Sequence, residues 1–517
     1  MKVVNRAIPY LKSYWFLLTL FLLCVAVKLY FISDDFIYFW YDQARDATIA
    51  RRILEEKDIK IQGPSASGTK DQIYHGVLYY YLIGPLYTLS SGSPKFVSLI
   101  IIILTSLFVF PVYALSKSLT NSELTAKLTT LLSVFSIDAV TTGVWLSNPV
   151  MLIVSVPLFY YLIWQVFFKH KTNLIWFLAL VLGVCNQAAL SSIYLQIVLI
   201  IIYIFQSIKQ KKLLIWKVKH YLIFIGVYLI TILTMILTQL KMFFEGSFSL
   251  KNLWSSAHID TSLIETLKAI APVYLRKIEL SLLPNFPYLS LIILLISSFF
   301  LLYRISNNKR FLYLLSFFGI GLFLFIHFRD AHHGLIGLTP IILLPISYGL
   351  SKILDSKKNL LKLVAVSFLV IYVGYHLRTM SINKQNRYYE LAIQKGFMLK
   401  DQLALIDQTY KIANGKPFSI STLTIPYGWN TTWGYLYNWY GQKKFGYKPL
   451  FLGPDQTGIF GQNYLISTNQ AQDVHFTIYE PEVNINQTLF NQFVESQNQA
   501  GLAINQFNYS QLILEQR

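Results

Sequence analysis

The polar interval that follows the first apolar run contains residue types suited to acid–base chemistry at a membrane surface. Asp42, Arg45 and Asp46 recur at helical spacing, so two carboxylates and a guanidinium share one face. A carboxylate steadied by a cation can accept a proton from a hydroxyl group, and an arginine can bind a phosphate. The same spacing is also typical of a salt-bridged helix start. The pattern therefore allows either a general base or a structural cluster.

A histidine returns to the membrane edge at the end of this interval. The Gly/Pro/Ser segment 63–68 cannot continue a helix and turns the chain towards Tyr74 and His75. We expect His75 either to line a site or to hold it in place through hydrogen bonds. His332 lies close to Arg329 near a later apolar run, but no chelating motif supports a metal there. We therefore expect neither a metal nor a cofactor.

The composition indicates a polytopic membrane protein. Apolar residues make up 54% of the chain and charged residues only 13%. The net charge of +19 falls mostly in short loops between apolar runs, which is typical of cytoplasmic loops. Nucleic-acid binding needs a continuous basic patch, and none is present in the sequence. The two cysteines lie inside apolar runs and indicate no disulfide framework.

The apolar runs predict the elements that position the polar interval. The run 76–89 is shorter than the roughly 20 residues that a crossing needs and contains Gly84 and Pro85, so we expect an interfacial or re-entrant helix. With that choice the basic loops fall on one side and interval 33–75 on the other. Counting the first helix, we therefore expect about eleven transmembrane helices, with the N-terminus in the cytoplasm. They are expected near 14–32, 95–116, 123–145, 148–168, 172–190, 192–206, 220–240, 286–303, 310–327, 333–350 and 362–377.

The last part of the chain loses the long apolar runs. Residues 378–517 predict a small extracytoplasmic α/β domain beyond the membrane domain 1–377. Within it we expect a helix over 383–414 and strands at 418–424, 463–467 and 474–479. The aromatic residues between 427 and 447 suit either sugar stacking or an ordinary core.

The interval resembles a known family. The run YDQARD…IARRIL…GPSASG…YHGVLYYYL resembles the first outer loop of the polytopic GT-C glycosyltransferases. The branch is that of the aminoarabinose transferases, the rhizobial lipopolysaccharide-core galacturonosyl transferases and the protein O-mannosyltransferases. Leu146-Ser147-Asn148-Pro149 resembles their Trp-Asn-Pro motif with Ser147 in place of Trp. Asn186-Gln187-Ala188 resembles a Gln-x-His position without the His. The motif match spans about 39–149.

The resemblance implies a reaction and a set of roles. A polyprenyl- or dolichyl-phosphate-linked sugar would be the donor, and an extracytoplasmic lipid, glycan or protein hydroxyl would be the acceptor. Asp42 would be the catalytic base for an inverting hexosyl or pentosyl transfer, and an Arg or Lys would hold the departing lipid phosphate. The substrate-binding candidates are Arg45, Asp46, Tyr74, His75, Asn148, Arg276, Arg329 and His332.

Two other functions remain open at this point. A flippase for a lipid-linked saccharide would need ionisable residues at mid-membrane depth, and the predicted spans hold almost none. A non-catalytic protein of cell-envelope assembly could keep the same fold with altered motifs, as at Ala188.

Overall fold

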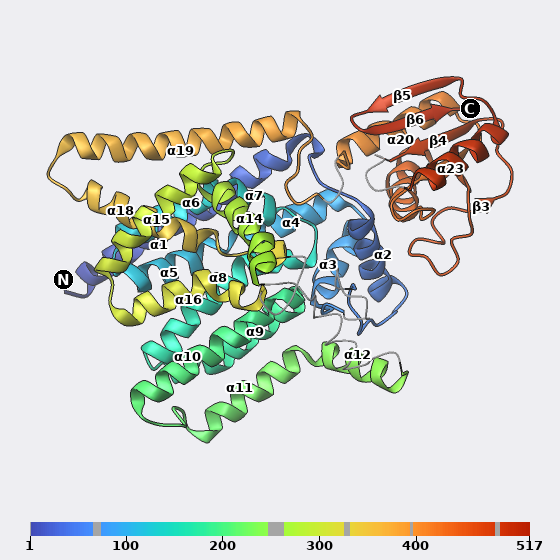
Figure 1. Cartoon of the computed structure of the whole chain (residues 1–517). Coiled ribbons are helices and arrows are strands. Elements are labelled where there is room, and N and C mark those ends of the chain that lie inside the picture. The colour runs from blue at the N-terminus through green and yellow to red at the C-terminus, as the bar shows by residue number, and fades with distance from the viewer. Residues whose placement is uncertain (1, 66–73, 247–262, 325–330, 393–395, 481–485) are drawn as a thin grey trace.

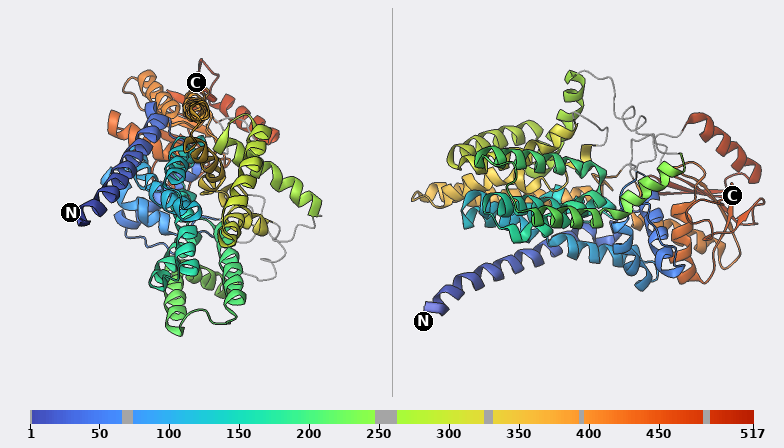
Figure 2. Two further views of the ribbon diagram at one scale, coloured as in Figure 1. Left: turned by 90° about the vertical axis from the view of Figure 1, so that its left-hand side faces the viewer. Right: turned by 90° about the horizontal axis from the view of Figure 1, so that it is seen from below.

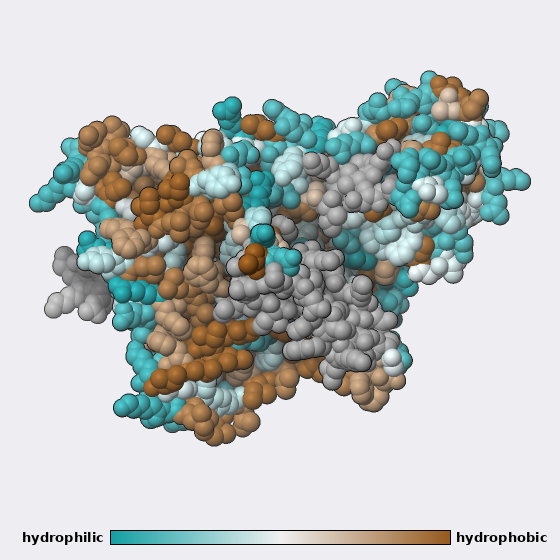
Figure 3. Space-filling model, in the orientation of Figure 1, coloured by the Kyte–Doolittle hydropathy of each residue, from teal (hydrophilic) through white to brown (hydrophobic). Residues whose placement is uncertain are grey.

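The computed structural model describes residues 2–65, 74–246, 263–324, 331–392, 396–480 and 486–517. Figures 1 and 2 show a long helical bundle with the N-terminus at one end and a C-terminal sheet domain at the other. The surface in Figure 3 is largely hydrophobic over the bundle and hydrophilic over the C-terminal domain. This division is the one expected for a membrane domain joined to a domain in water.

Among the described residues, six helical segments are long and apolar enough to cross a membrane. They lie in α1 (Lys2–Ile32), α4–α5 (Pro94–Ser106 and Val109–Thr120), η2–α8–η3 (Asn148–Met151, Leu152–Ile163 and Trp164–Phe168), α10 (Tyr194–Gln210), α15 (Pro287–Arg304) and α19 (Asn359–Gln385). Further helices follow the remaining predicted runs: α9 (Ile175–Ala188), α16 (Asn307–Leu324) and α18 (Thr339–Leu354). The helix α14 (Leu263–Leu282) was not predicted, because it lies between the runs 220–240 and 286–303. The predicted fold class, a polytopic helical membrane protein with a small C-terminal α/β domain, is confirmed.

Two of the predicted spans are broken rather than straight. The run 123–145 forms α6 (Glu123–Phe135) and α7 (Ile137–Gly143), bent by 63°. The backbone N–H of Ile137, which the bend frees, donates to Nδ1 of the buried His376 at 3.1 Å. A break inside a membrane is tolerated when a neighbour satisfies the backbone in this way. The run 220–240 likewise forms α11 (Val218–Thr231) and α12 (Leu233–Phe244), bent by 65°.

The short apolar run after His75 is a helix that packs on the polar interval. It forms α3 (Leu78–Leu89), which packs on α2 (Tyr41–Glu55). Twelve residues of helix span only about 18 Å, so α3 is too short to cross a bilayer, as predicted. Gly84 allows close packing because a Cβ there would lie 2.8 Å from the carbonyl oxygen of Ala50.

The C-terminal domain is a six-stranded sheet with the order β3-β2-β1-β4-β6-β5. Its strands are β1 (Ser419–Leu423), β2 (Leu450–Leu452), β3 (Ser467–Thr468), β4 (His475–Tyr479), β5 (Asn505–Tyr509) and β6 (Leu512–Gln516). β1 pairs in parallel with β2 and β4, and β6 pairs antiparallel with β4 and β5. Two predicted strands appear as β1 and β4. The third, at 463–467, is limited to β3, while β2, β5 and β6 were not predicted.

The predicted helix over 383–414 is wrong as a single element. α19 continues to Gln385, through the predicted domain boundary at 377–378, and α20 (Leu399–Ala413) begins separately. Other helices of this domain are α21 (Thr431–Leu436), α22 (Gln442–Phe445) and α23 (Gln487–Ala500).

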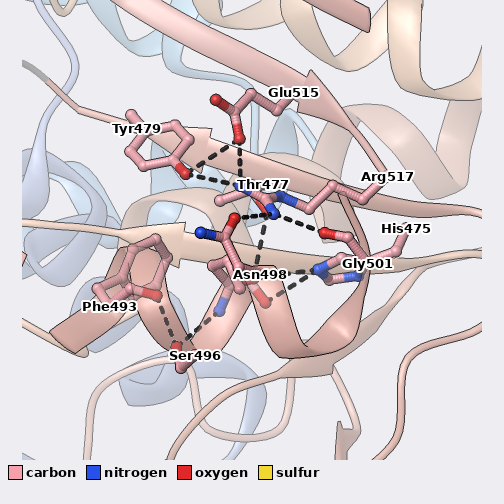
Figure 4. A network of polar contacts seen from close by, with 11 residues as sticks. His475, Thr477, Tyr479, Phe493, Ser496, Asn498, Gly501, Glu515 and Arg517 are labelled. Carbon is pink, nitrogen blue, oxygen red and sulfur yellow. Dashed lines mark hydrogen bonds and ion pairs between the residues drawn. The ribbon is translucent and has the colours of Figure 1, made fainter. Parts of the chain in front are cut away.

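A network of polar contacts joins α23 to the sheet (Figure 4). The guanidinium of Arg517 donates to Asn498 Oδ1 at 3.0 Å and to the Tyr479 hydroxyl at 3.2 Å, and it pairs with Glu515. On the same sheet, His475 contacts Gln497 of α23 at 3.3 Å. Buried polar groups that satisfy one another in this way fix one packing arrangement. We therefore assign these residues a structural role.

Candidate active site

The start of α2 brings the predicted carboxylates and guanidinium together. Arg45 Nη1 donates to Asp42 Oδ1 at 2.7 Å, and Arg45 Nη2 donates to Asp46 Oδ1 at 2.7 Å. A third bond runs from Arg45 Nε to Asp46 Oδ1 at 3.0 Å. The helix begins here because the side chain of Gln43 accepts the backbone N–H of Trp40 at 3.1 Å. Helical spacing thus produces the grouping that the sequence indicates.

The two carboxylates differ in exposure, and this separates their roles. The side chain of Asp46 is 2% exposed, whereas that of Asp42 is 36% exposed. Burial raises the pKa of Asp46 to about 6, although the charge of Arg45 opposes the rise. Arg45 donates hydrogen bonds to both carboxylates and so orients Asp42. Asp42 is the carboxylate that an incoming substrate can reach.

A cavity of about 390 Å³ opens beside this cluster; we call it the loop cavity. It is lined by Tyr41 and Arg45 of α2, by Tyr74 and the 60–65 segment, and by Phe460 of the C-terminal domain. Its volume lies within the range of small-molecule sites. The predicted residues Arg45 and Tyr74 therefore meet at one cavity.

An aromatic side chain of the C-terminal domain contacts the same end of α2. The ring of Trp429 packs on that of Tyr41 with centroids 5.4 Å apart, and Trp429 is 37% exposed. Among the other aromatic residues between 427 and 447, Trp433, Tyr435 and Tyr437 are fully buried, whereas Tyr427 is exposed. Of the two interpretations left open for this segment, the core interpretation fits these three residues.

The buried Glu480 fixes the loop that carries Trp429. It accepts the backbone N–H of Ile425 at 2.9 Å and the indole N–H of Trp433 at 3.0 Å. Burial raises the pKa of this carboxyl group to about 8, although both hydrogen bonds oppose the rise. Glu480 therefore holds the two ends of the segment that carries Trp429, at Ile425 and at Trp433.

We expect Glu480→Gln to flatten the pH dependence of stability. A carboxyl whose pKa is raised on folding contributes stability at low pH and loses it as pH rises through the folded value. The wild-type chain should therefore lose stability between about pH 4.5 and 8, by an amount on the order of 4 kcal/mol. Thermal unfolding of the purified chain across this range measures the slope. The exposed Glu495→Gln serves as control, and an unchanged slope in Glu480→Gln would contradict the assignment.

His75 holds the turn that follows the loop. Its Nδ1 accepts the backbone N–H of Leu190 at 3.0 Å. Burial, together with the charges of His333 and Arg45, lowers its pKa to about 3. The neighbouring Gly76 is required because a Cβ there would lie 1.7 Å from Gln187 Oε1. His75 is thus a neutral positioning residue close to both Arg45 and His333.

A second cavity, of about 470 Å³, lies in the bundle; we call it the bundle cavity. Lys277 Nζ pairs with both oxygens of Asp138 at 2.6 and 2.8 Å, and the hydroxyl of Thr339 donates to the same carboxylate. His333 stacks on Trp145 with centroids 5.3 Å apart. All of these residues except Thr339 line the cavity. Two charges act on His75: that of Arg45, which lines the loop cavity, and that of His333, which lines the bundle cavity.

The predicted Arg276 lies at the bundle cavity but is already paired. Its guanidinium makes two bonds to Glu390, at 2.7 and 2.8 Å, and one to Glu279 at 2.8 Å. Asn148 is buried at the start of η2 and is not among the residues lining the two cavities. Arg329 and the side chain of His332 lie outside the described residues.

Sequence reasoning missed Asp138 and its partner interaction. The available signal was an isolated acid inside the apolar run 123–145, since an ionisable residue within a span is a functional candidate. Lys28 is a second buried charge in a span, and its Nζ donates to Thr105 Oγ1 at 2.9 Å. The expectation that the spans are almost free of ionisable residues is therefore wrong. Within the described parts of the chain, no cluster of three or more His, Cys, Asp or Glu could hold a metal ion.

Comparison with known proteins gives matches in structure alone. No protein-family model matches the chain, and no curated protein sequence matches it. ArnT from Cupriavidus metallidurans, bound to undecaprenyl phosphate, matches with a TM-score of 0.51 at 10% identity, over 96% of this chain and 97% of that one. The apo state of the same ArnT gives a TM-score of 0.53 at 10% identity with the same coverage.

A further structural match is the archaeal oligosaccharyltransferase AglB from Archaeoglobus fulgidus, in complex with an inhibitory peptide and a dolichol-phosphate. It has a TM-score of 0.49 at 9% identity, over 91% of this chain and 70% of that one. The ArnT matches run from the first membrane helix through the C-terminal domain. The chain therefore has the fold of ArnT over nearly its whole length, and this fold agrees with the one that the motifs of residues 39–149 led us to expect.

Proposed function

We propose that the chain is a glycosyltransferase that moves a hexose or pentose from a polyprenyl-phosphate-linked donor to an acceptor hydroxyl, with inversion. The observation that carries this proposal is the 36% exposed carboxylate of Asp42, which is paired with Arg45, a residue that lines the loop cavity although Asp42 itself does not. The ArnT structure that holds undecaprenyl phosphate has the same fold and supports a lipid-phosphate donor. Glycosyl transfer from such a donor needs no nucleotide-binding loop.

The reaction needs one proton acceptor and one leaving-group site. Asp42 takes the proton of the acceptor hydroxyl as its oxygen attacks the anomeric carbon. The bond between that carbon and the phosphate oxygen breaks, and the polyprenyl phosphate leaves with the bonding electrons. Arg45 holds the carboxylate of Asp42 in place through its 2.7 Å hydrogen bond. Its position is in turn fixed by the buried Asp46.

The two cavities suit the two substrates. The bundle cavity lies among membrane helices and is lined by Arg276, Lys277 and His333. The two cations are paired with Glu390 and Asp138, so the phosphate of a lipid-linked donor would bind there by sharing their donors with these carboxylates. The loop cavity joins α2 to the C-terminal domain through Phe460 and suits the acceptor. His75 lies near both Arg45 and His333, so a sugar passing between the cavities would pass close to it.

The orientation is part of the proposal. We place the N-terminus in the cytoplasm and the C-terminal domain outside the plasma or inner membrane, because the basic loops then face the cytoplasm. The two native cysteines, Cys24 and Cys185, are buried. A cysteine introduced at the exposed Glu55 should therefore react with an impermeant maleimide added to intact cells. Labelling that occurs only after lysis would contradict the orientation.

A flippase for a lipid-linked saccharide is the second candidate. It is favoured by one observation, the buried charges of Lys28 and of the Asp138–Lys277 pair inside the bundle. Proteoliposomes containing an undecaprenyl-phosphate-linked hexose separate the two functions. Our proposal predicts a new glycosidic bond and free undecaprenyl phosphate. Movement of the donor between leaflets without a new bond would favour the flippase.

A further inference from the structure

A third cavity lies at the junction of the bundle and the C-terminal domain, away from Asp42. Its volume is about 710 Å³, and we call it the arginine cavity. Three arginines from separate segments line it, and side-chain amides and hydroxyls provide most of the remaining polar groups. No acidic residue is among its lining residues. The polar side chains that line it include Arg276, Arg378, Arg387, Asn383, Asn386 and Gln511.

The charge of the arginine cavity is only partly balanced. Arg276 pairs with Glu390 at 2.7 Å, and Arg387 pairs with Asp401 at 2.9 Å. Arg378 is exposed on α19, and no hydrogen bond or ion pair joins it to another of the described residues. The cavity therefore presents one guanidinium whose donors are available to a ligand. An arginine in this state favours a phosphate or carboxylate group, which it can bind with two parallel hydrogen bonds.

The position of the cavity relative to the membrane indicates the source of that anion. The apolar spans of α15 and α19 are only 17% buried each, so both helices face lipid. The cavity lies where α15 begins and where α19 passes Arg378. The two helix ends are joined there, because the Tyr375 hydroxyl donates to the carbonyl oxygen of Pro284 at 2.6 Å. The cavity thus opens at the end of two lipid-facing helices.

Exposed aromatic residues mark the same level. Phe286 is 50% exposed and Tyr288 is 73% exposed at the start of α15. Aromatic residues at the ends of membrane helices are typical of the headgroup region. Phe286 also lines the arginine cavity and contacts the ring of Tyr375. The cavity is therefore placed at the depth of lipid phosphates.

We propose that the arginine cavity binds the phosphate of an anionic membrane lipid, with Arg378 as the main contact. Residues 378, 382 and 386 follow one face of α19 and its end, and Asn383 and Asn386 line the same cavity as Arg378. Basic pockets between membrane helices bind such headgroups. Gln511 of the C-terminal domain also lines the cavity, so a bound lipid headgroup would lie between that domain and the bundle. This inference does not depend on the proposed transferase function.

Native mass spectrometry of the purified chain in detergent tests the proposal. Dioleoylphosphatidylglycerol is titrated as the anionic lipid and dioleoylphosphatidylcholine as the zwitterionic comparison. We expect Arg378→Gln to weaken phosphatidylglycerol binding about tenfold, because a hydrogen bond to a charged group is lost. Arg378→Lys, which keeps the charge without the planar fork, should lose less. The matched control is Arg304→Gln at the opposite end of α15, which should bind like the wild type.

The outcomes separate the sources of the phosphate. Competition by inorganic phosphate at constant ionic strength supports recognition of the phosphate group itself. Binding of inorganic phosphate without any preference for phosphatidylglycerol would overturn the lipid assignment. Equal lipid affinity in the wild type, Arg378→Gln and Arg304→Gln would overturn the site. Thermal unfolding without added lipid should be the same for the wild type and Arg378→Gln, since Arg378 has no hydrogen-bond or ion-pair partner to lose among the described residues.

Discussion

Asp42→Asn is expected to lower the rate of sugar transfer about 100- to 10,000-fold, the usual contribution of a general base. The amide keeps the shape of the side chain and can still accept a hydrogen bond from Arg45, but it cannot take a proton. Binding of undecaprenyl phosphate should be unchanged, because the bundle cavity does not include Asp42. The measurement is the initial rate of product formation by purified protein in proteoliposomes.

Glu55→Gln is the matched control for this substitution. Glu55 lies on the same helix, pairs with Arg51 at 2.9 Å and is 37% exposed, close to the 36% of Asp42. It should retain wild-type transfer. Asp42→Asn with wild-type turnover would remove Asp42 as the base. Loss of transfer in both variants would show that the effect comes from the helix and not from one carboxylate.

The second large effect concerns the buried pair in the bundle cavity. Asp138→Asn should destabilise the chain by about 3–5 kcal/mol, because Lys277 is then left buried without its counter-charge. The double variant Asp138→Asn with Lys277→Met should recover most of this loss, since no buried charge remains. Unfolding in detergent, by heat or denaturant, measures the stability of the four proteins of this double-mutant cycle: the wild type, Asp138→Asn, Lys277→Met and the double variant.

An exposed pair gives the comparison for that cycle. Glu123 and Lys127 pair at 2.9 Å on the surface of α6, where such pairs contribute about 0.5 kcal/mol or less. Glu123→Gln should therefore have little effect. If Asp138→Asn were as mild as Glu123→Gln, the bundle cavity would be more hydrated than its geometry indicates.

The sequence was informative where the physics is local. Asp42, Arg45 and Asp46 lie within five residues, so helical spacing alone predicts that they meet. The apolar runs predict helices because an unsatisfied backbone cannot cross a bilayer. The bend at Ser136 could not be predicted, because the apolar run continues through it and the compensating partner, His376, lies far along the chain.

Contacts between distant segments were beyond the sequence. Lys277 lies 139 residues from Asp138, and nothing in either neighbourhood indicates the pair. Composition likewise showed an aromatic segment after residue 427 but could not tell its faces apart. The fold buries Trp433 in the domain core and leaves Trp429 against α2. The strand β5 is short and mostly polar, and β6 is a short apolar run followed by two polar residues, so neither shows a clear alternation.

The role of Asp42 as the base of sugar transfer is tested most directly by following a labelled sugar in proteoliposomes. Undecaprenyl phosphate carrying a radiolabelled hexose or pentose is mixed with a glycolipid acceptor and either the wild-type chain or Asp42→Asn. We expect the wild-type chain to move the label into a new glycosidic bond and to release one undecaprenyl phosphate for each bond formed. The variant should bind the donor equally and leave the label on the lipid. Transfer by Asp42→Asn at the wild-type rate would show that Asp42 is not the catalytic base.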